Sequence, residues 1–528
     1  MDYTSLKNPL LIALIGLLLG LAADLMTYNQ PLGISVPIIA TLVLIGLIGL
    51  ALVEKSPLTV ANLWLVLPLL TLTVFSAVRA APLLRFLNVS GAVLLLALLA
   101  NRLTSPVVTT LNIGGYFVAF AESMVFSLFV PFRLLPRSAA ELRQREGTGE
   151  RPLRRVLVGL LIAAPFLCLF TYLFAAADLV FSNMVNRILG ALNMADIIGH
   201  TLLTATLAWI IMGGLAYALA RTARGPLHLS QATASSSNAE EAGESALEPS
   251  GLPQPPARKW IGALEGAVAL FSIDVLFALF VAIQFAALFG GEAFLRSQGL
   301  TYSEYARRGF FELLAVAGIT LCLILGLDFI TRRESPLQQA GFLAGAGLMT
   351  GLTIVILASA FQRLRLYELA YGFTRLRVHS HVFMIWLAIL LVVMFVLLLV
   401  NRIRWFATAT LVAAIGFTLT LDFLNPDAFI VKWNLARYME GEELDVAYLG
   451  SLSEDAVPQL IPLLYQYEAE IGQQIGPWLR TRLDRLDQRA QRATWPSTHL
   501  GIDQAYRALD VNRGLIEQFE PAYTYWFD

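Results

Sequence analysis

Long apolar runs separated by short polar segments set the pattern of this chain. Each run is close to the roughly 20 residues that a helix needs to cross the hydrocarbon core of a bilayer. Backbone groups in lipid must bond within their own segment, so such runs form helices. The pattern predicts an all-α integral membrane protein with about eleven transmembrane helices, near 9–26, 34–53, 60–78, 83–101, 155–176, 198–220, 264–289, 309–330, 340–361, 380–400 and 404–424.

Three apolar segments leave alternatives open. The first run resembles a signal peptide, but its n-region is weakly basic and its apolar stretch is long, so we interpret it as a span. Residues 106–131 and 179–197 are interrupted by polar residues. Each either lies in the membrane interface or dips in and returns. If 106–131 spans, the count becomes twelve.

A composition break and a polar tail divide the chain into four parts. Residues 1–221 form a first membrane half of about six spans, and residues 222–259 are too poor in large apolar side chains to order themselves. Residues 260–424 form a second half of five spans. Residues 425–528 have helical periodicity, with helices expected at 469–490 and 500–519, which predicts a small all-α soluble domain.

Composition agrees with lipid as the main solvent. Hydrophobic residues make up 57% of the 528 residues and charged residues only 14%, whereas a soluble domain is about 25% charged. The net charge of −1 gives no field that would attract nucleic acid. Cys168 and Cys322 both lie in apolar runs, so neither a disulfide framework nor a metal site is indicated.

Arginines set the expected orientation. The loop 132–155 holds the densest basic cluster beside a span, which places it in the cytoplasm. Counting onward places 221–260, 331–337 and 401–404 on the same side and the tail outside. The loops 291–308 and 362–379, which this count places outside, are themselves rich in arginine and argue against it.

The segment 363–381 carries a candidate anion site. Arg363, Tyr367 and Tyr371 repeat every four residues and share one helix face, and Arg365, Arg375 and Arg377 lie nearby. Arginine's planar fork matches phosphate or carboxylate. The alternative is ordinary arginine contact with lipid headgroups. His379 and His381 have no visible third partner for a metal, and no nucleotide, haem or flavin motif occurs, so no cofactor is predicted.

A second candidate lies in residues 301–312, where Arg307 and Arg308 could bind an anion with Glu312 holding one of them. The alternative is an interfacial anchor closed by the pair Arg308–Glu312. If both loops face one compartment, they could converge on one ligand, such as a lipid headgroup or a lipid-linked phosphate.

Acidic residues within spans are costly and often functional. Asp274 lies about ten residues into its run and is the acid we single out, either as an interhelical acceptor or as a proton carrier. Acids near span ends are expected to be solvated at the interface: Asp24, Asp178, Asp328 and Asp422.

Glycine pairs in the runs favour close helix packing. Gly16 and Gly20 are four apart, as are Gly341 and Gly345, and Gly347 and Gly351. The stretch around Gly345 superficially resembles a nucleotide-binding loop, but no strand precedes it and it lies within a span.

Four short stretches resemble the signatures of uncharacterised polytopic bacterial membrane proteins, the family called domain of unknown function 4173, and less closely the family numbered 4153. They are Thr301–Glu312, Arg365–Arg377, Asn425–Asp427 with Asn434–Arg437, and Asp445–Leu449. The resemblance covers roughly residues 260–470. It implies a multi-pass protein of the bacterial plasma (inner) membrane, with no known activity and no catalytic residues to transfer.

Three functions fit this pattern. The first is a non-enzymatic scaffold or sensor that presents residues 425–528 to an envelope protein partner. The second is a transporter or lipid-handling protein that uses Asp274 and the two arginine–tyrosine loops. The third is a membrane glycosyl or lipid-phosphate transferase using Asp24, although the loop after the first span is short for one. Membrane lipid is a partner in all three.

Overall fold

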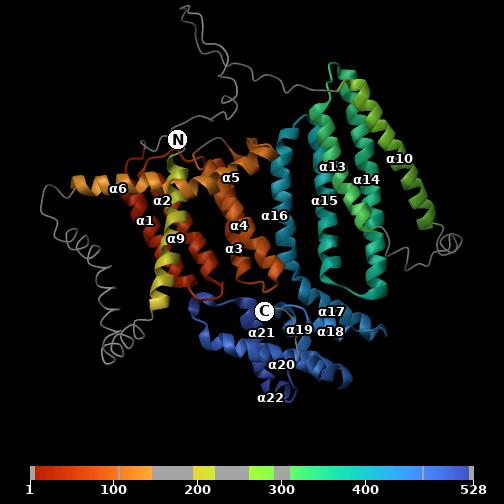
Figure 1. Cartoon of the computed structure of the whole chain (residues 1–528). Helices are drawn as coiled ribbons and strands as arrows, with labels where there is room; N and C mark the ends of the chain where they lie inside the picture. The colour runs from red at the N-terminus through yellow and green to blue at the C-terminus, as the bar shows by residue number, and fades with distance from the viewer. Residues whose placement is uncertain are drawn as a thin grey trace, which may run out of the picture.

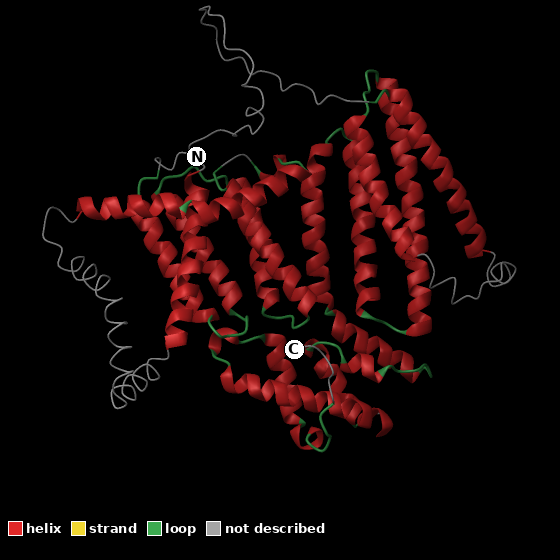
Figure 2. Cartoon of the chain, viewed as in Figure 1, coloured by secondary structure: helices red, strands yellow, loops and turns green. Residues whose placement is uncertain are grey.

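A computed structural model describes residues 6–104, 107–145, 194–220, 261–289, 310–465 and 469–522. Within these ranges the chain is built from helices and loops, without a β-strand (Figure 2). The protein is therefore an all-α multi-pass membrane protein, as its apolar pattern predicted. The predicted span 155–176, the linker 222–259 and the segment 301–309 lie outside the described residues.

Nine helices in the described part of the chain are long and apolar enough to cross a membrane. They coincide with nine of the predicted runs. They are α1 (Pro9–Thr27), α2 (Ser35–Val53), α4 (Pro82–Arg102), α9 (Met194–Ala220), α10 (Ala263–Phe289), α13 (Phe310–Ile330), α14 (Pro336–Tyr371), α15 (Arg375–Leu399) and α16 (Phe406–Leu424).

The predicted run 60–78 forms a shorter element, in which the 3₁₀ helix η2 (Val60–Leu65) continues into α3 (Val66–Ser76). The ambiguous segment 106–131 is not a straight span. After the one-turn η3 (Val108–Thr110), α5 (Ile113–Phe129) bends by 45° into α6 (Pro131–Arg145). Proline at the first position of α6 suits this break, because it has no N–H to continue the preceding helix.

The helices form two bundles joined by α16. Helices α1 to α6 and α9 make the first bundle, α10, α13, α14 and α15 make the second, and α16 stands between them (Figure 1). In the first bundle α1 and α9 approach closely, because a Cβ at Gly20 would lie 2.5 Å from Cα of Ala208. The glycine pair Gly16–Gly20 thus has the packing role that its spacing predicted.

Residues 426–465 and 469–522 form a layer of helices across one end of both bundles (Figure 1). We call it the C-terminal layer. It has its own apolar core, which includes Ile430, Leu460, Ile475 and Leu509. Its elements are α17 (Pro426–Met439), α18 (Val446–Gly450), η7 (Glu454–Ala456), α19 (Val457–Leu460), η8 (Ile461–Leu464), α20 (Ala469–Arg492), η9 (Trp495–Ser497), α21 (Leu500–Val511) and α22 (Arg513–Ile516).

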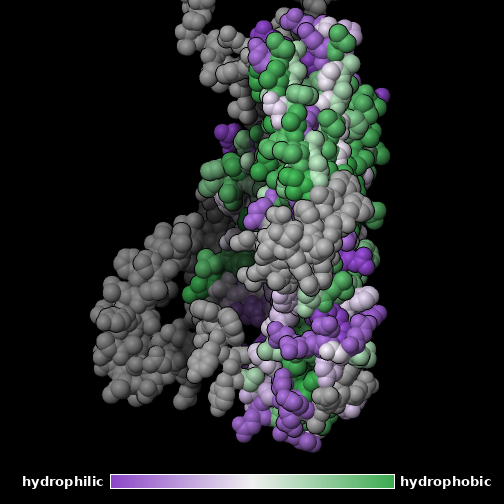
Figure 3. All heavy atoms as spheres, turned by 90° about the vertical axis from the view of Figure 1, so that its right-hand side faces the viewer, coloured by the Kyte–Doolittle hydropathy of each residue, from purple (hydrophilic) through white to green (hydrophobic). Residues whose placement is uncertain are grey.

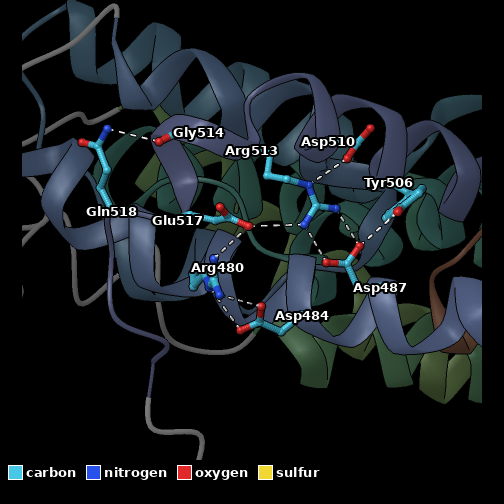
Figure 4. Close-up of polar contacts among 9 residues, drawn as sticks. All are labelled: Arg480, Asp484, Asp487, Tyr506, Asp510, Arg513, Gly514, Glu517 and Gln518. Atoms are coloured by element: carbon cyan, nitrogen blue, oxygen red, sulfur yellow. Dashed lines mark hydrogen bonds and ion pairs between the residues drawn. The ribbon is translucent and has the colours of Figure 1, made fainter.

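A charged network joins α20 to α21 and α22 (Figure 4). Arg513 donates to Asp487 at 2.7 and 2.8 Å and to Asp510 at 2.9 Å. Arg480 lies 3.5 Å from Glu517. These contacts join the outer helices of the layer to one another.

The surface of the helix bundles and the surface of the C-terminal layer differ in hydropathy. In the side view, hydrophobic side chains cover the second bundle and hydrophilic ones cover the C-terminal layer (Figure 3). The arginine-bearing helix α6 and the layer lie at opposite ends of the bundles (Figure 1). The apolar belt between them is the part of the protein embedded in the membrane.

Candidate functional site

Four of the predicted site residues, Tyr367, Tyr371, Arg375 and Arg377, lie at the turn between α14 and α15. Gly372 ends α14 with a φ of +75°, a conformation that glycine adopts without steric cost. A Cβ at this position would lie 2.8 Å from both Nη1 of Arg437 and Oδ1 of Asn434, two residues of α17. The C-terminal layer therefore packs directly on the turn.

Two side chains of α17 bind the backbone of the turn. Asn434 accepts from the N–H of Phe373 at 2.7 Å and donates to the carbonyl of the same residue at 3.0 Å. Arg437 donates to the carbonyl of Leu369 at 2.7 Å. The last carbonyls of a helix have no partner within it, so α17 satisfies groups that α14 leaves free.

Arg375, in the first turn of α15, forms an ion pair with Asp427 of α17. Its Nε and Nη2 donate to the two carboxylate oxygens at 2.7 and 2.6 Å. Asp427 is 1% exposed and also accepts from the N–H of Ser453 at 2.8 Å. Burial alone would raise the pKa of Asp427, but the bonds from Arg375 and Ser453 lower it below its usual value.

Arg377 and the two tyrosines form a second cluster on the same turn. The Arg377 guanidinium lies 4.1 Å above the ring of Tyr367, and its Nη1 donates to the carbonyls of Tyr371 and Gly372. The rings of Tyr367 and Tyr371 are 4.9 Å apart. Tyr371 is 55% exposed, so one side of this cluster is open to the interface.

The other two arginines of the segment, Arg363 and Arg365, do not join either cluster. Arg363 is buried and donates to Oε1 of Gln284 on α10 at 2.6 Å, an oxygen that also accepts from Ser359. Arg365 is exposed. The shared face of Arg363, Tyr367 and Tyr371 therefore does not make one pocket, because Arg363 turns inward to α10.

The second predicted arginine loop is only partly described. Arg307 and Arg308 lie outside the described residues, and Glu312 is exposed in the first turn of α13. Convergence of the two loops on one ligand remains a prediction. Behind the first loop, Nδ1 of His381 lies 3.0 Å from Oε1 of the buried Glu368.

A second attachment joins the C-terminal layer to the first bundle. Oδ2 of Asp455 accepts from the backbone N–H groups of Ala80 and Ala81 at 2.8 and 3.1 Å, immediately before α4. A carboxylate is favoured at a helix N-terminus by the free N–H groups and the helix dipole. Burial nevertheless raises the pKa of Asp455 above its usual value.

A third attachment involves the segment before α21. The N–H of Leu500 donates to the carbonyl of Ala77 at 2.8 Å, and the N–H of Ile34 donates to that of Thr498 at 2.9 Å. Between them His499 is fully buried, and its Nδ1 accepts from Ile502. Both contacts are with the first bundle, so this attachment reinforces the one that Asp455 makes.

Sequence reasoning named Asp427, Asn434, Arg437 and Tyr448 only as members of family signatures and gave them no role. Tyr448 accepts from the N–H of Arg375 at 2.8 Å. The signal that could have paired them is that Arg375 and Asp427 are charged residues of opposite sign, each just outside a predicted apolar run. Asp455 gave no such signal, because its partners are backbone groups far away in the chain.

The acids near span ends are not all solvated, contrary to the prediction. Asp422 is fully buried and accepts from Nδ2 of Asn88 at 2.9 Å. Asp24 is 1% exposed, and its Oδ2 lies 2.7 Å from Nδ1 of His200. Both are covered because neighbouring helices and the C-terminal layer close over the span ends. Asp328 keeps a partly exposed pair with Arg333 at 2.7 Å, and Asp178 lies outside the described residues.

Asp274 is the most isolated acid of the second bundle. It is 2% exposed on α10, and its Oδ1 has no hydrogen-bond partner among the described residues. It faces α14 at Gly345, where a Cβ would lie 3.6 Å from its Oδ2. An acidic residue buried within a membrane helix is costly and marks a candidate functional group.

The model of one protein family matches residues 65–463, and its description is "Domain of unknown function (DUF4153)". The chain therefore belongs to this family, the one its signatures resembled less closely. The match includes both partners of the Arg375–Asp427 pair. No curated protein and no solved structure matches the chain.

Proposed function

As the chain belongs to the DUF4153 family, whose description names no activity, we propose that it is a non-enzymatic membrane scaffold or sensor. In this role the C-terminal layer is held rigidly on the membrane bundles and presented to an envelope protein partner. The layer lies on the extracytoplasmic side of a bacterial plasma membrane.

The observation that carries the proposal is the way the layer is attached. Arg375–Asp427 ties it to the second bundle and Asp455 ties it to the first, so it bridges two groups of helices. Among the described helices, α16 is the one that stands between these groups (Figure 1). A change in the layer would therefore be transmitted to both bundles, as a sensor requires.

The outer face of the layer suits a polar partner. The network around Arg513 and Asp487 places charged side chains on the helices α20, α21 and α22 of the layer (Figure 4), and Val511 is 84% exposed at the end of α21. Transient interfaces combine charged rims with a few apolar anchors.

Site-specific photocrosslinking in membranes tests the proposal. A benzophenone side chain at Val511 is expected to give one discrete protein adduct, and the same group at the exposed Leu83 of α4 is the control. The adduct should weaken when Arg375→Gln loosens the layer. Absence of a discrete adduct from correctly folded protein would contradict the scaffold role.

Asp274 supports a second candidate, a proton-coupled transporter. Its burial and its unpartnered oxygen suit a group that takes up and releases a proton within the membrane. Proton flux into proteoliposomes, followed with a trapped pH-sensitive dye, should fall in Asp274→Asn and stay unchanged in Glu265→Gln, a change at an exposed acid in the first turn of the same helix. Equal flux in the wild type and both variants, or no flux in any of them, would exclude this candidate.

A further inference from the structure

An apolar groove opens among the helices of the first bundle. Its volume is about 420 Å³, and its walls come from α1, α2, α3, α4, α5 and α9. On α4 the wall includes Val89, Ala92, Val93 and Leu96, which share one helix face. Since hydrocarbon surrounds this part of the bundle, the groove suits a hydrocarbon chain.

Arg85 stands at the end of the groove nearest the C-terminal layer. It lies one helical turn before Val89 on the same face of α4, and it is half-buried. Its Nη2 lies 3.5 Å from the carbonyl oxygen of Leu32, a residue whose side chain lines the groove. A cation therefore marks the mouth of an otherwise apolar site.

A second cation approaches from the C-terminal layer. Arg489 of α20 lines a cleft of about 260 Å³ with Trp495 and Thr498. Its Nη2 donates to the carbonyl of Ser497 at 3.1 Å. Burial lowers the pKa of Arg489 below its usual value, and the nearby positive charge of Arg85 lowers it further.

The two arginines are not neutralised by a paired acid. Within the described part of the chain, no carboxylate forms an ion pair with either of them. Asp503 lines the same cleft as Arg489, and its charge and that of Glu454 offset part of the lowering of the Arg489 pKa without forming an ion pair.

The backbone around Gly33 joins the surroundings of the two arginines. Arg85 reaches the carbonyl of Leu32. A Cβ at Gly33 would lie 2.7 Å from the carbonyl oxygen of Ser497, to which Arg489 donates. Two half-buried cations on either side of this segment favour an anion between them.

We propose that this groove binds one acyl chain of a membrane phospholipid whose anionic phosphate lies between Arg85 and Arg489. Arginine presents paired donors that match phosphate oxygens. Trp495 is 61% exposed beside them, and tryptophan is favoured at the level of lipid headgroups. The bound lipid would join α4 to the C-terminal layer.

Native mass spectrometry of the full-length, delipidated protein with added phosphatidylglycerol tests the phosphate contact. Each arginine near a membrane surface contributes roughly a fivefold change in affinity. The double variant Arg85→Gln/Arg489→Gln should therefore bind more weakly by about 25-fold. Arg492→Gln, an exposed arginine one turn further along α20, is the matched control and should bind normally.

Unchanged binding by the double variant, or equal weakening by Arg492→Gln, would overturn the phosphate contact. Diacylglycerol, which has the acyl chains without the phosphate, should bind wild type and the double variant equally weakly. If it binds wild type as tightly as phosphatidylglycerol does, the headgroup assignment is wrong.

Filling the groove with a bulky side chain tests whether it binds the acyl chain. Val93→Trp places a large side chain in the groove and should reduce phosphatidylglycerol binding, whereas Leu83→Trp on the lipid-facing side of α4 should not. Retained binding in a Val93→Trp protein of normal melting temperature would exclude the groove. A benzophenone at Val93 that crosslinks to protein instead of lipid would show another occupant.

Discussion

Arg375 and Asp427 join a membrane helix to the C-terminal layer through two parallel hydrogen bonds of 2.7 and 2.6 Å. Arg375 begins α15, and Asp427 lies in the first turn of α17, directly after the last span. Asp427 also accepts from Ser453. One buried carboxylate therefore fixes three segments of the chain relative to one another.

Arg375→Gln should loosen the layer from the second bundle. It leaves the buried carboxylate of Asp427 without its cation, at a cost of roughly 2–4 kcal/mol, reduced from that of a fully buried pair because Arg375 is 36% exposed. The melting temperature of the detergent-solubilised protein should fall, and proteolysis near residues 424–426 should become faster. Arg365→Gln, at an exposed arginine of the same segment, is the control, and equal losses in both would contradict a specific pair.

Gly501→Ala should separate the layer from the first bundle. A Cβ at residue 501 would lie 2.5 Å from both Oδ1 of Asp455 and the carbonyl oxygen of Val78, so the two surfaces must move apart. Such overpacking costs about 1–3 kcal/mol. Hydrogen exchange at the start of α4 should increase. Gly514→Ala meets no atom within 4 Å and should leave that exchange unchanged.

His499 should make the attachment weaken in acid. Burial, with Arg85 and Arg489 nearby, lowers its pKa to about 4. Between pH 6.5 and about 4, His499 binds a proton in the unfolded chain but not in the folded chain, so the folded state loses stability as the pH falls. The loss reaches about 3 kcal/mol.

His499→Asn removes this titration and keeps a side chain that can cap α21. Exchange of α21 amides should then depend less on pH between 6.5 and 4 than in wild type. The same pH dependence in both proteins would assign the effect to other groups.

Gly20→Ala should destabilise the first bundle. The added methyl would lie 2.5 Å from the backbone of Ala208, so α1 and α9 must separate, at a cost of about 1–3 kcal/mol. Gly49→Ala on α2 meets no atom within 4 Å and should be neutral or slightly stabilising. Thermal unfolding of the two variants compares them directly, and equal melting temperatures would refute the close contact.

A cysteine at Val511 tests the side of the membrane on which the layer lies. In a protein whose Cys168 and Cys322 are replaced by alanine, a membrane-impermeant maleimide added outside intact cells should label Val511→Cys. Val511 is 84% exposed, so access does not depend on unfolding. Labelling only after the membrane is opened would place the layer in the cytoplasm and reverse the predicted orientation.

The sequence predicted the candidate spans well because their signal is local. A run such as 380–400 needs only enough consecutive apolar side chains that their favourable transfer into lipid outweighs the cost of moving the backbone peptide groups out of water. Helix α15 follows this run closely. Residues 106–131, for which the sequence leaves alternatives open, form a bent pair of helices, whereas residues 60–78, predicted as a full span, form a shorter, partly 3₁₀ element.

Apolar length and charge counts by themselves determined that this is a helical multi-pass membrane protein with a polar helical tail. Only the tertiary structure decided what the charged residues near the spans contact. Arg375 meets Asp427 from 52 residues away, and Asp455 caps α4 from more than 370 residues away. Such pairs form because burial makes an unpaired charge costly, and which surfaces become buried depends on how distant helices pack.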